Sequence, residues 1–379
     1  MTAPAGSPGA EPPGGAASAP RPEPGGLREL AALFLRLGCT SFGGPAAHVA
    51  MLHDEVVRRR RWVDEQELLD TISATNLVPG PNSTELAIHL GARRAGWRGL
   101  VVSGVCFILP AAALATALAW AYVRYGDTPS LEGVLYGVKP VVIAIVAAAL
   151  WSLAPTAAGT PPRAALAVAA AAGYLAGVDE LGLLAAAGLL GLAAHLGRRP
   201  PPALLGVGLV PLFLTFVKIG SVLYGSGYVL LAFLDGELVD RLGWLTEQQV
   251  LDAASVGQVT PGPVFTTATF VGYLVAGVPG AVVATVGIFL PSFVFAGLLG
   301  RLVGWLRSSA ATGAVLDAVN AGALGLMGGV LLRLGGDALV DAPTVAVAAV
   351  AGLVLWRTEV SSTWLIAAGA TIGLLHTHL

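Results

Sequence analysis

The chain has 379 residues, of which 55% are hydrophobic and 12% are charged, and its mean hydropathy is +0.76. Soluble domains carry about 25% charged residues, so this composition excludes an ordinary soluble enzyme. The 21 Lys and Arg nearly balance the 23 Asp and Glu, which leaves no basic surplus to attract nucleic acid. The two cysteines, Cys39 and Cys106, show no metal-ligand spacing. The chain is therefore predicted to be an integral membrane protein.

The first 27 residues are rich in Pro, Gly and Ala and lack a basic start followed by an apolar core. They are predicted to form a disordered tail and not a secretory signal. Beyond this tail, about ten apolar stretches are long enough to cross a membrane core of ~30 Å. They lie near residues 28–50, 99–124, 131–155, 162–178, 180–197, 205–234, 281–304, 309–333, 338–357 and 361–378. The expected fold class is an all-α polytopic membrane protein.

The chain contains an internal duplication. Residues 34–81 align without a gap with residues 216–263, and 17 of the 48 positions are identical. The identities include Glu55 with Glu237, Asp70 with Asp252, and a Pro-Gly-Pro motif at 79–81 and 261–263. Internal repeats of this kind are typical of transporter folds. We therefore predict a first transporter repeat over residues 28–199 and a second over residues 203–379.

Loop charges indicate that the two repeats have opposite orientations. Between its first two spans the first repeat carries seven arginines, whereas the corresponding segment of the second repeat carries only Arg241. The seven are Arg58, Arg59, Arg60, Arg61, Arg93, Arg94 and Arg98. Because short cytoplasmic loops concentrate Lys and Arg, equivalent loops are expected on opposite sides of the membrane. Inverted repeats need an odd number of spans in each half, and about five spans per half meet this requirement. An extra crossing in each half would change the side of the membrane on which the termini lie.

Each Pro-Gly-Pro motif lies between two helix-forming segments. A proline interrupts a helix but suits the first turn of a new one, so each motif is predicted to break a re-entrant helical hairpin. Helices that begin at Pro81 and Pro263 would direct N–H groups and positive dipole ends at a cavity, an arrangement that binds anions. The predicted substrate-binding residues here are Gly80, Pro81, Asn82, Ser83, Thr84, Gly262, Pro263 and Thr266, with Thr267 as a further donor. The alternative is a surface turn between amphipathic helices that lie on the membrane.

Three basic residues lie inside apolar stretches, where a charge costs about 2.5 to 3.5 kcal/mol at the membrane centre. Arg36 and Lys218 are equivalent in the two repeats, and Lys139 aligns with Asn320. The chain has 19 arginines and two lysines, and both lysines lie in these stretches. A compact ammonium that can lose its proton suits an anion site. Arg36, Lys139 and Lys218, together with Asn320 at the position equivalent to Lys139, are therefore also predicted to bind substrate. The alternative is that the basic side chains snorkel to the interface.

Two glycine-rich runs are also equivalent in the repeats, residues 41–45 and 224–227. If each run breaks a helix, its backbone N–H groups line the cavity, which adds Gly43, Gly44, Tyr224 and Gly225 to the predicted site. The alternative is that clustered glycines only allow close helix packing. His48 and Glu85 have no counterparts, because Leu230 and Thr266 stand at the equivalent positions. These two residues either make transport asymmetric or are solvated.

The sequence contains no phosphate loop, catalytic triad or metal-ligand cluster. The chain is therefore not expected to be an enzyme, and neither a cofactor nor a metal is expected.

Several spaced motifs resemble the chromate ion transporter (CHR) family in its long form with two homologous halves. In the first half they are Leu37-Gly38, the run 41–45, Trp62, Glu65, Gln66, the motif 79–81 and Lys139-Pro140. In the second half they are the runs 224–227 and 260–263. The resemblance covers about residues 28–379. It departs from the family pattern at Ser226 and Asn320, which leaves the contributions of the two halves unequal.

This resemblance implies a multi-pass carrier of the cell inner membrane that exports chromate, confers chromate resistance and draws on the proton-motive force. Sulfate or another oxyanion stays open as the substrate, and an anion channel stays open as the mechanism. A membrane-embedded chromate reductase would need a redox cofactor or a cysteine pair, which the sequence lacks. The expected partners are the transported anion and the lipid bilayer; a homodimer is left open, and no nucleic acid is expected.

Overall fold

The computed structural model describes residues 26–42, 44–75, 78–126, 128–193, 208–223, 229–307, 310–358, 360 and 362–378. Within these ranges the chain is helical apart from short connections, and it contains no β-strand. Residues 1–25, which cover most of the predicted tail, lie outside the described residues. The all-α class predicted from the sequence is confirmed for the part of the chain that the structure describes.

The first half contains seven α-helices and one short π-helix among its described residues. They are α1 (Leu27–Thr40), α2 (Gly44–His53), the π-helix η1 (Asp54–Arg59), α3 (Glu65–Thr75), α4 (Asn82–Tyr125), α5 (Pro129–Ala157), α6 (Pro161–Leu175) and α7 (Glu180–Ala193).

The second half repeats this order helix by helix. It contains α8 (Leu209–Val222), α9 (Leu230–Leu234), the π-helix η3 (Asp235–Arg241), α10 (Glu247–Val259), the 3-10 turn η4 (Val264–Thr266), α11 (Thr267–Arg307), α12 (Ala310–Ala338), α13 (Ala342–Arg357) and α14 (Ser362–His378). Even the unusual π-helices recur at equivalent positions, so the duplication seen in the sequence extends to local backbone geometry.

The long helices α4 and α11 each fold back on themselves. In α4 the break falls at Ala95 and Gly96, where Gly96 has a φ of 60°, and in α11 the equivalent Gly277 has a φ of 62°. A Cβ on Gly99 would overlap the carbonyl oxygen of Gly91, although eight residues of straight helix would separate them by about 12 Å. The predicted spans 99–124 and 281–304 are therefore the second legs of longer, bent elements, whose first legs follow the Pro-Gly-Pro motifs.

The prediction of one continuous span over 28–50 is wrong. Helix α1 ends at Thr40, Ser41 and Phe42 are not helical, and α2 begins at Gly44. The predicted span 205–234 is likewise divided, because α8 ends at Val222 and α9 begins at Leu230. Both interruptions fall at or next to the glycine-rich runs 41–45 and 224–227 of the sequence.

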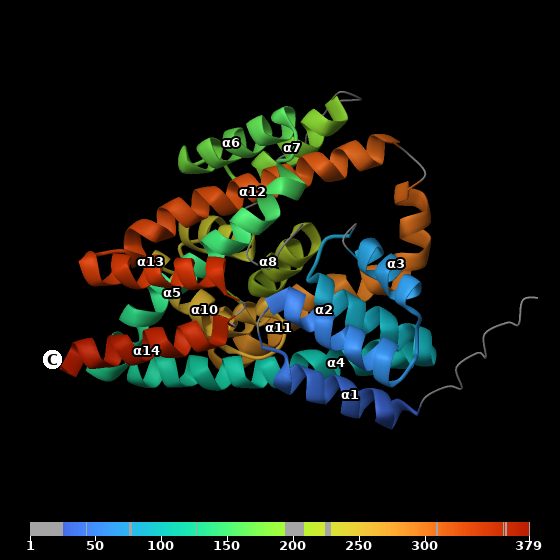
Figure 1. Ribbon diagram of the computed structural model, residues 1–379, viewed down its shortest axis with the longest axis horizontal. Helices are drawn as coiled ribbons and strands as arrows, with labels where there is room; N and C mark the ends of the chain where they lie inside the picture. Colours follow the sequence, from blue (N-terminus) through green and yellow to red (C-terminus); the bar gives the residue numbers. More distant parts are fainter. Residues whose placement is uncertain are drawn as a thin grey trace, which may run out of the picture.

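The helices of the two halves pack across each other. Helices α6 and α7 of the first half lie against α12 of the second, and α13 and α14 of the second half lie against α5 of the first (Figure 1). Helix α4 packs against its own counterpart, α11. Each half therefore completes its packing with helices of the other half, in a reciprocal arrangement.

Four helices among the described residues are long and apolar enough to cross a membrane: Asn82–Tyr125, Pro129–Ala157, Val264–Leu299 and Asp317–Ala338. The helices of the other predicted spans have at most 17 described residues each. Large apolar side chains such as Leu109, Trp151 and Leu332 are exposed on the outer surface. Such a surface suits contact with lipid and does not suit contact with water.

Candidate anion-binding site between the two halves

The two Pro-Gly-Pro loops are tied to the helix breaks of the opposite halves. The N–H of Gly80 donates to the carbonyl oxygen of Leu223 at 2.8 Å, and the N–H of Gly262 donates to that of Ser41, also at 2.8 Å. Leu223 and Ser41 are equivalent positions in the two repeats, so the exchange is reciprocal. Both glycines have positive φ values, 136° and 95°, which other residues rarely adopt. Each Pro-Gly-Pro loop is therefore joined to the residue that follows the first helix of the opposite half.

A helix starts directly after each of these loops. The N–H groups of Thr84 and Glu85 donate to the carbonyl oxygen of Pro81, at 2.7 and 3.0 Å, and the N–H of Thr266 donates to that of Pro263 at 3.0 Å. Pro81 and Pro263 thus immediately precede the helices, whereas the sequence predicted helices that begin at the prolines themselves. After Pro263 one 3-10 turn intervenes before α11. Helix N-termini carry a partial positive charge that favours anions.

Both helix starts border one cavity of about 350 Å³, which we call the central cavity. Residues of the first half lining it are His48, Pro81, Asn82, Ser83, Leu153, Thr156 and Ala157; those of the second half are Val229, Pro263, Val264, Phe265, Asp317, Asn320, Ala323, Leu324 and Met327. Five predicted site residues, Pro81, Asn82, Ser83, Pro263 and Asn320, are therefore brought together from three distant segments. No Lys or Arg among the described residues lines this cavity.

His48 supplies a polar ring at the cavity wall. Its Nε2 lies 3.0 Å from the carbonyl oxygen of Ser41, and its Nδ1 lies 3.1 Å from Oγ of Ser83. Because a carbonyl only accepts, Nε2 carries the hydrogen and the Ser83 hydroxyl donates to Nδ1. His48 and Glu85 are 1% and 0% exposed, so the alternative that these two residues are solvated is wrong.

The predicted basic residue Lys139 lies away from the central cavity, in an ion pair. Its Nζ is 3.0 Å from Oδ1 of Asp252, whose Oδ2 accepts a hydrogen bond of 2.7 Å from the hydroxyl of Tyr122. These residues, with Gln248 and Gln249, line an opening of about 640 Å³ that we call the second-half vestibule. The side chains of Lys139 and Asp252 are 10% and 2% exposed, so Lys139 does not snorkel to an interface.

Arg36 and Lys218 are also ion-paired, and in the same way. Lys218 lies 2.8 Å from Glu237, and the equivalent Arg36 pairs with the equivalent Glu55. Arg59 and Arg241, four residues after the two glutamates, form a second pair in each half. Burial acts to raise the pKa of Glu55, but the hydrogen bond and charge of Arg36, with Arg60 and Arg59, hold that pKa below its ordinary value.

Sequence reasoning missed the three carboxylates that hold these cations. Glu55, Glu237 and Asp252 are among the identities of the internal alignment, and this repetition of acidic residues beside apolar spans was the available signal. Each of the three cations is neutralised by a buried carboxylate and so links two segments of the chain. A role of these cations in binding substrate stays a prediction.

Some of the remaining predicted residues make local contacts, and others lie outside the described residues. Thr266 and Thr267 donate their hydroxyls to the carbonyl oxygens of Pro263 and Val264, at 2.8 and 2.7 Å, and do not line the central cavity. Thr84 is fully buried and also lies outside the cavity lining. Gly44 is the first residue of α2. Gly43, Tyr224 and Gly225 lie outside the described residues.

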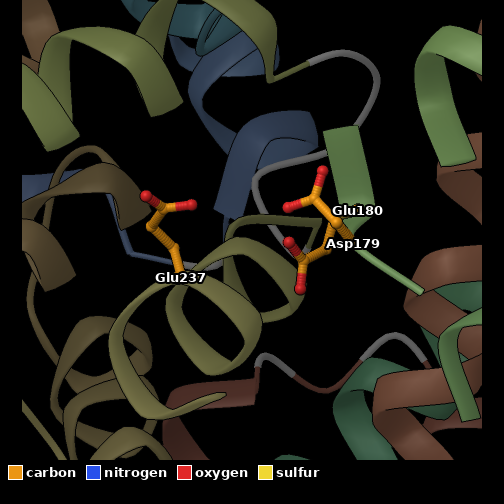
Figure 2. Close-up of side chains that lie close together, drawn as sticks. All are labelled: Asp179, Glu180 and Glu237. Carbon is orange, nitrogen blue, oxygen red and sulfur yellow. The ribbon is translucent and has the colours of Figure 1, made fainter. Parts of the chain in front are cut away.

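One group of acidic residues could hold a metal ion by its spacing alone. Asp179, Glu180 and Glu237 place carboxylate oxygens within 4.8 Å of one another, from the start of α7 and from η3 (Figure 2). The residues lie far apart in the chain, so the sequence did not show this group. Glu237 already pairs with Lys218 and Arg241, and these two cations offset the negative charge that would attract a metal.

Two homologous helical halves with membrane-length apolar helices, which meet at a cavity with several polar side chains, define a duplicated polytopic membrane protein of the transporter type. The chain belongs to the chromate transporter family, whose model matches residues 28–192 and again residues 210–374.

Similar proteins carry corresponding names. The chain is 33% identical to the chromate transport protein of Cupriavidus metallidurans over 377 residues, which covers 92% of this chain and 93% of that protein. It is 32% identical to the probable chromate transport protein of Synechococcus elongatus, with 87% and 90% covered, and 30% identical to the chromate transport protein of Pseudomonas aeruginosa, with 93% of each covered. No solved structure matches the chain.

Proposed function

We propose that this protein carries chromate through the central cavity, exports it across the cell inner membrane and thereby confers chromate resistance, with energy from the proton-motive force. The observation that carries the proposal is the reciprocal junction of Gly80 with Leu223 and of Gly262 with Ser41. This junction brings the start of α4 and the 3-10 turn before α11 to one cavity between homologous halves. Helix starts directed at a cavity are a transporter arrangement for anionic substrates. The names of the relatives support chromate as the substrate.

The lining of the cavity suits a substrate that must be released. A carrier that bound a dianion through buried cations would hold it too tightly, because binding must stay weak enough for exit. The lining offers as donors the neutral side chains of Asn82, Ser83 and Asn320, together with the residues that start α4 and the 3-10 turn η4. Asp317, which also lines the cavity, is paired with Arg163. We therefore assign substrate binding to these donors, and we assign Lys139, Arg36 and Lys218 to ion pairs that hold helices together.

The two vestibules support alternating access between inverted halves. The first-half vestibule, of about 460 Å³, is lined by Gln66, Glu67 and Asp70, and the second-half vestibule by their equivalents Gln248, Gln249 and Asp252. In inverted repeats, equivalent vestibules open on opposite faces of the membrane.

The two sides are packed differently. Helix α10 packs against α5, where the Lys139–Asp252 pair joins them, whereas α3 has no comparable packing against α12 among the described residues. The equivalent of the pair would join Asp70 to Asn320, which cannot form an ion pair. We propose that this structure is the state in which the second-half side is closed.

Uptake of labelled chromate into inverted and right-side-out vesicles tests the proposed function. We expect uptake into inverted vesicles that a protonophore reduces, and little uptake into right-side-out vesicles. Excess unlabelled sulfate reports whether the site accepts another tetrahedral dianion. Trans-stimulated counterflow identifies a carrier, and its absence with conductance present would instead indicate an anion channel. No chromate flux above that of empty vesicles in either orientation would contradict the proposal.

A further inference from the structure

Glu85 is a buried carboxyl group that the proposed function does not yet use. It lies in the first turn of α4 and is 0% exposed. Neither of its carboxyl oxygens has a hydrogen-bond partner among the described residues, and it takes part in none of their ion pairs. The buried carboxylates Glu55, Glu237 and Asp252, in contrast, are each paired with Lys or Arg. Among the buried acids of the described residues, Glu85 is the one with both carboxyl oxygens buried and without a hydrogen-bond partner.

The carboxyl group lies directly behind the Pro-Gly-Pro loop. A Cβ on Gly80 would collide with the carboxyl group of Glu85 and would lie 3.0 Å from Oγ of Ser292 on α11. Oγ of Ser292 is likewise buried and without a hydrogen-bond partner among the described residues. The residues that follow Gly80, namely Pro81, Asn82 and Ser83, line the central cavity. A charge on Glu85 would thus act on the cavity through one thin loop.

The charged and titratable groups around Glu85 have partners elsewhere. On the cavity side, His48 of α2 is held by Ser41 and Ser83, and Asp317 of α12 pairs with Arg163. Lys218 of α8 pairs with Glu237. On the vestibule side lie His89 and Arg93 of α4, Glu67 and Asp70 of α3, and Asp64 just before α3, with Arg93 paired to Glu67. From α11 the nearby polar group is the neutral hydroxyl of Ser292.

An unpaired carboxylate in a buried site is unfavourable, whereas a neutral carboxylic acid is tolerated there. A negative charge beside the cavity would also repel an entering dianion. We propose that Glu85 is a proton-binding site coupled to the anion site, so that the oxyanion binds in the central cavity when the Glu85 carboxylate has taken up a proton. This inference rests on the proposed function and specifies its coupling ion and residue.

A route for the proton lies along α4. His89 is four residues after Glu85, a spacing that places both side chains on one helix face. His89 lines the first-half vestibule, so it connects the buried acid to that opening. The equivalent of Glu85 in the second half is Thr266, whose hydroxyl donates to Pro263 and cannot serve as an acid. The duplication therefore keeps this acid in the first half and not at its equivalent in the second. About one proton should accompany each anion, so each exported chromate would carry a net charge of −1 outward, and the electrical component of the proton-motive force, negative inside, would drive it.

The test measures protons taken up when chromate binds to the purified full-length protein in detergent. Chromate is added to a weakly buffered solution with a pH indicator, and binding is measured by equilibrium dialysis between about pH 6 and pH 9. The parent should take up about one proton more per bound chromate than Glu85→Gln. Its chromate affinity should fall about tenfold per pH unit on the alkaline side, while that of Glu85→Gln stays nearly constant. Protonation of chromate itself contributes equally to both proteins and cancels in the difference.

Glu132→Gln is the matched control, because Glu132 is an exposed acid in the first turn of α5; it should behave like the parent. Equal proton uptake and equal pH profiles in the parent and Glu85→Gln would overturn the inference while leaving the proposed function in place. If neither protein binds chromate, the proposed function fails. If size-exclusion chromatography shows that Glu85→Gln does not fold, the test uses the parent protein alone. At the alkaline end of the pH range chromate is already a dianion, so chromate binding to the parent without proton uptake there would overturn the inference.

Discussion

Nζ of Lys139 lies 3.0 Å from Oδ1 of Asp252, and this ion pair joins α5 of the first half to α10 of the second. The equivalent positions hold Asn320 and Asp70, which cannot form an ion pair. The two halves are therefore homologous in backbone but unequal in the contact that holds one side of the central cavity closed. In the proposed cycle this pair must open when the second-half side opens.

Lys139→Met removes the cation and leaves the Asp252 carboxylate buried without a charge partner. Breaking a buried pair from one side typically costs about 3 to 5 kcal/mol, so we expect a clear loss of thermal stability and of transport. The double variant K139M/D252N removes both charges and should regain most of the stability, as thermal unfolding of the purified proteins would show. If Lys139 bound the anion directly, Asp252→Asn alone would spare chromate binding and Lys139→Met would abolish it.

Gly80→Ala and Gly262→Ala are expected to abolish transport. Both glycines have positive φ, and an added Cβ would collide with Glu85 at the first position and lie 2.9 Å from Cβ of Ala111 at the second. The loop would have to move, which breaks its hydrogen bond to the opposite half. Gly177→Ala is the control, because Gly177 also has a positive φ of 80° but open space around it. Vesicle uptake of chromate at matched protein levels measures the effect. Normal uptake in the Gly80 and Gly262 variants would favour the alternative that each Pro-Gly-Pro motif is a surface turn.

Ser83→Ala should weaken chromate binding about tenfold. On anion binding the Ser83 hydroxyl would turn from Nδ1 of His48 to the anion, and a hydrogen bond to a charged group contributes roughly 1.5 to 3 kcal/mol. Ser83 lies at the cavity wall with its hydroxyl next to Nδ1 of His48. Ser152→Ala is the matched control, since Ser152 is exposed on α5 and its hydroxyl donates to the carbonyl oxygen of Ala149. Equilibrium binding of chromate compares the variants. Equal affinities for both would remove Ser83 from the anion site.

Labelling of a matched pair of cysteine variants tests the inverted topology. Arg58 and Asp240 are equivalent positions, and both are exposed. In a background without Cys39 and Cys106, a cysteine at Arg58 should be shielded from an impermeant thiol reagent in intact cells, and a cysteine at Asp240 should react. The expectation follows from the arginines that surround Arg58, since basic loops stay in the cytoplasm. Equal labelling of the two variants in intact cells, with both reactive after lysis, would exclude inverted repeats.

Local residue patterns predicted the elements that depend on a few neighbouring residues. The duplication follows from the sequence identity between the two halves. The helix starts next to Pro81 and Pro263 follow from the fixed φ of proline, and the class of membrane helices follows from the apolar runs. The lengths of the spans were less predictable. Helix α1 ends at Thr40, inside an apolar stretch, and a turn at Gly96 joins two helical legs that a hydropathy window cannot separate.

What the sequence by itself determined, then, is a duplicated, helical membrane protein with a proline-flanked break in each half, because those properties arise from composition and from local backbone chemistry. Only the tertiary structure decided which helices pack across the halves and which carboxylates neutralise Arg36, Lys139 and Lys218. A buried cation requires a buried partner, but any of several acids could serve until the halves close on each other. The packing of the two halves also leaves Glu85 buried without a partner among the described residues. The amino-acid sequence alone does not show this consequence of packing.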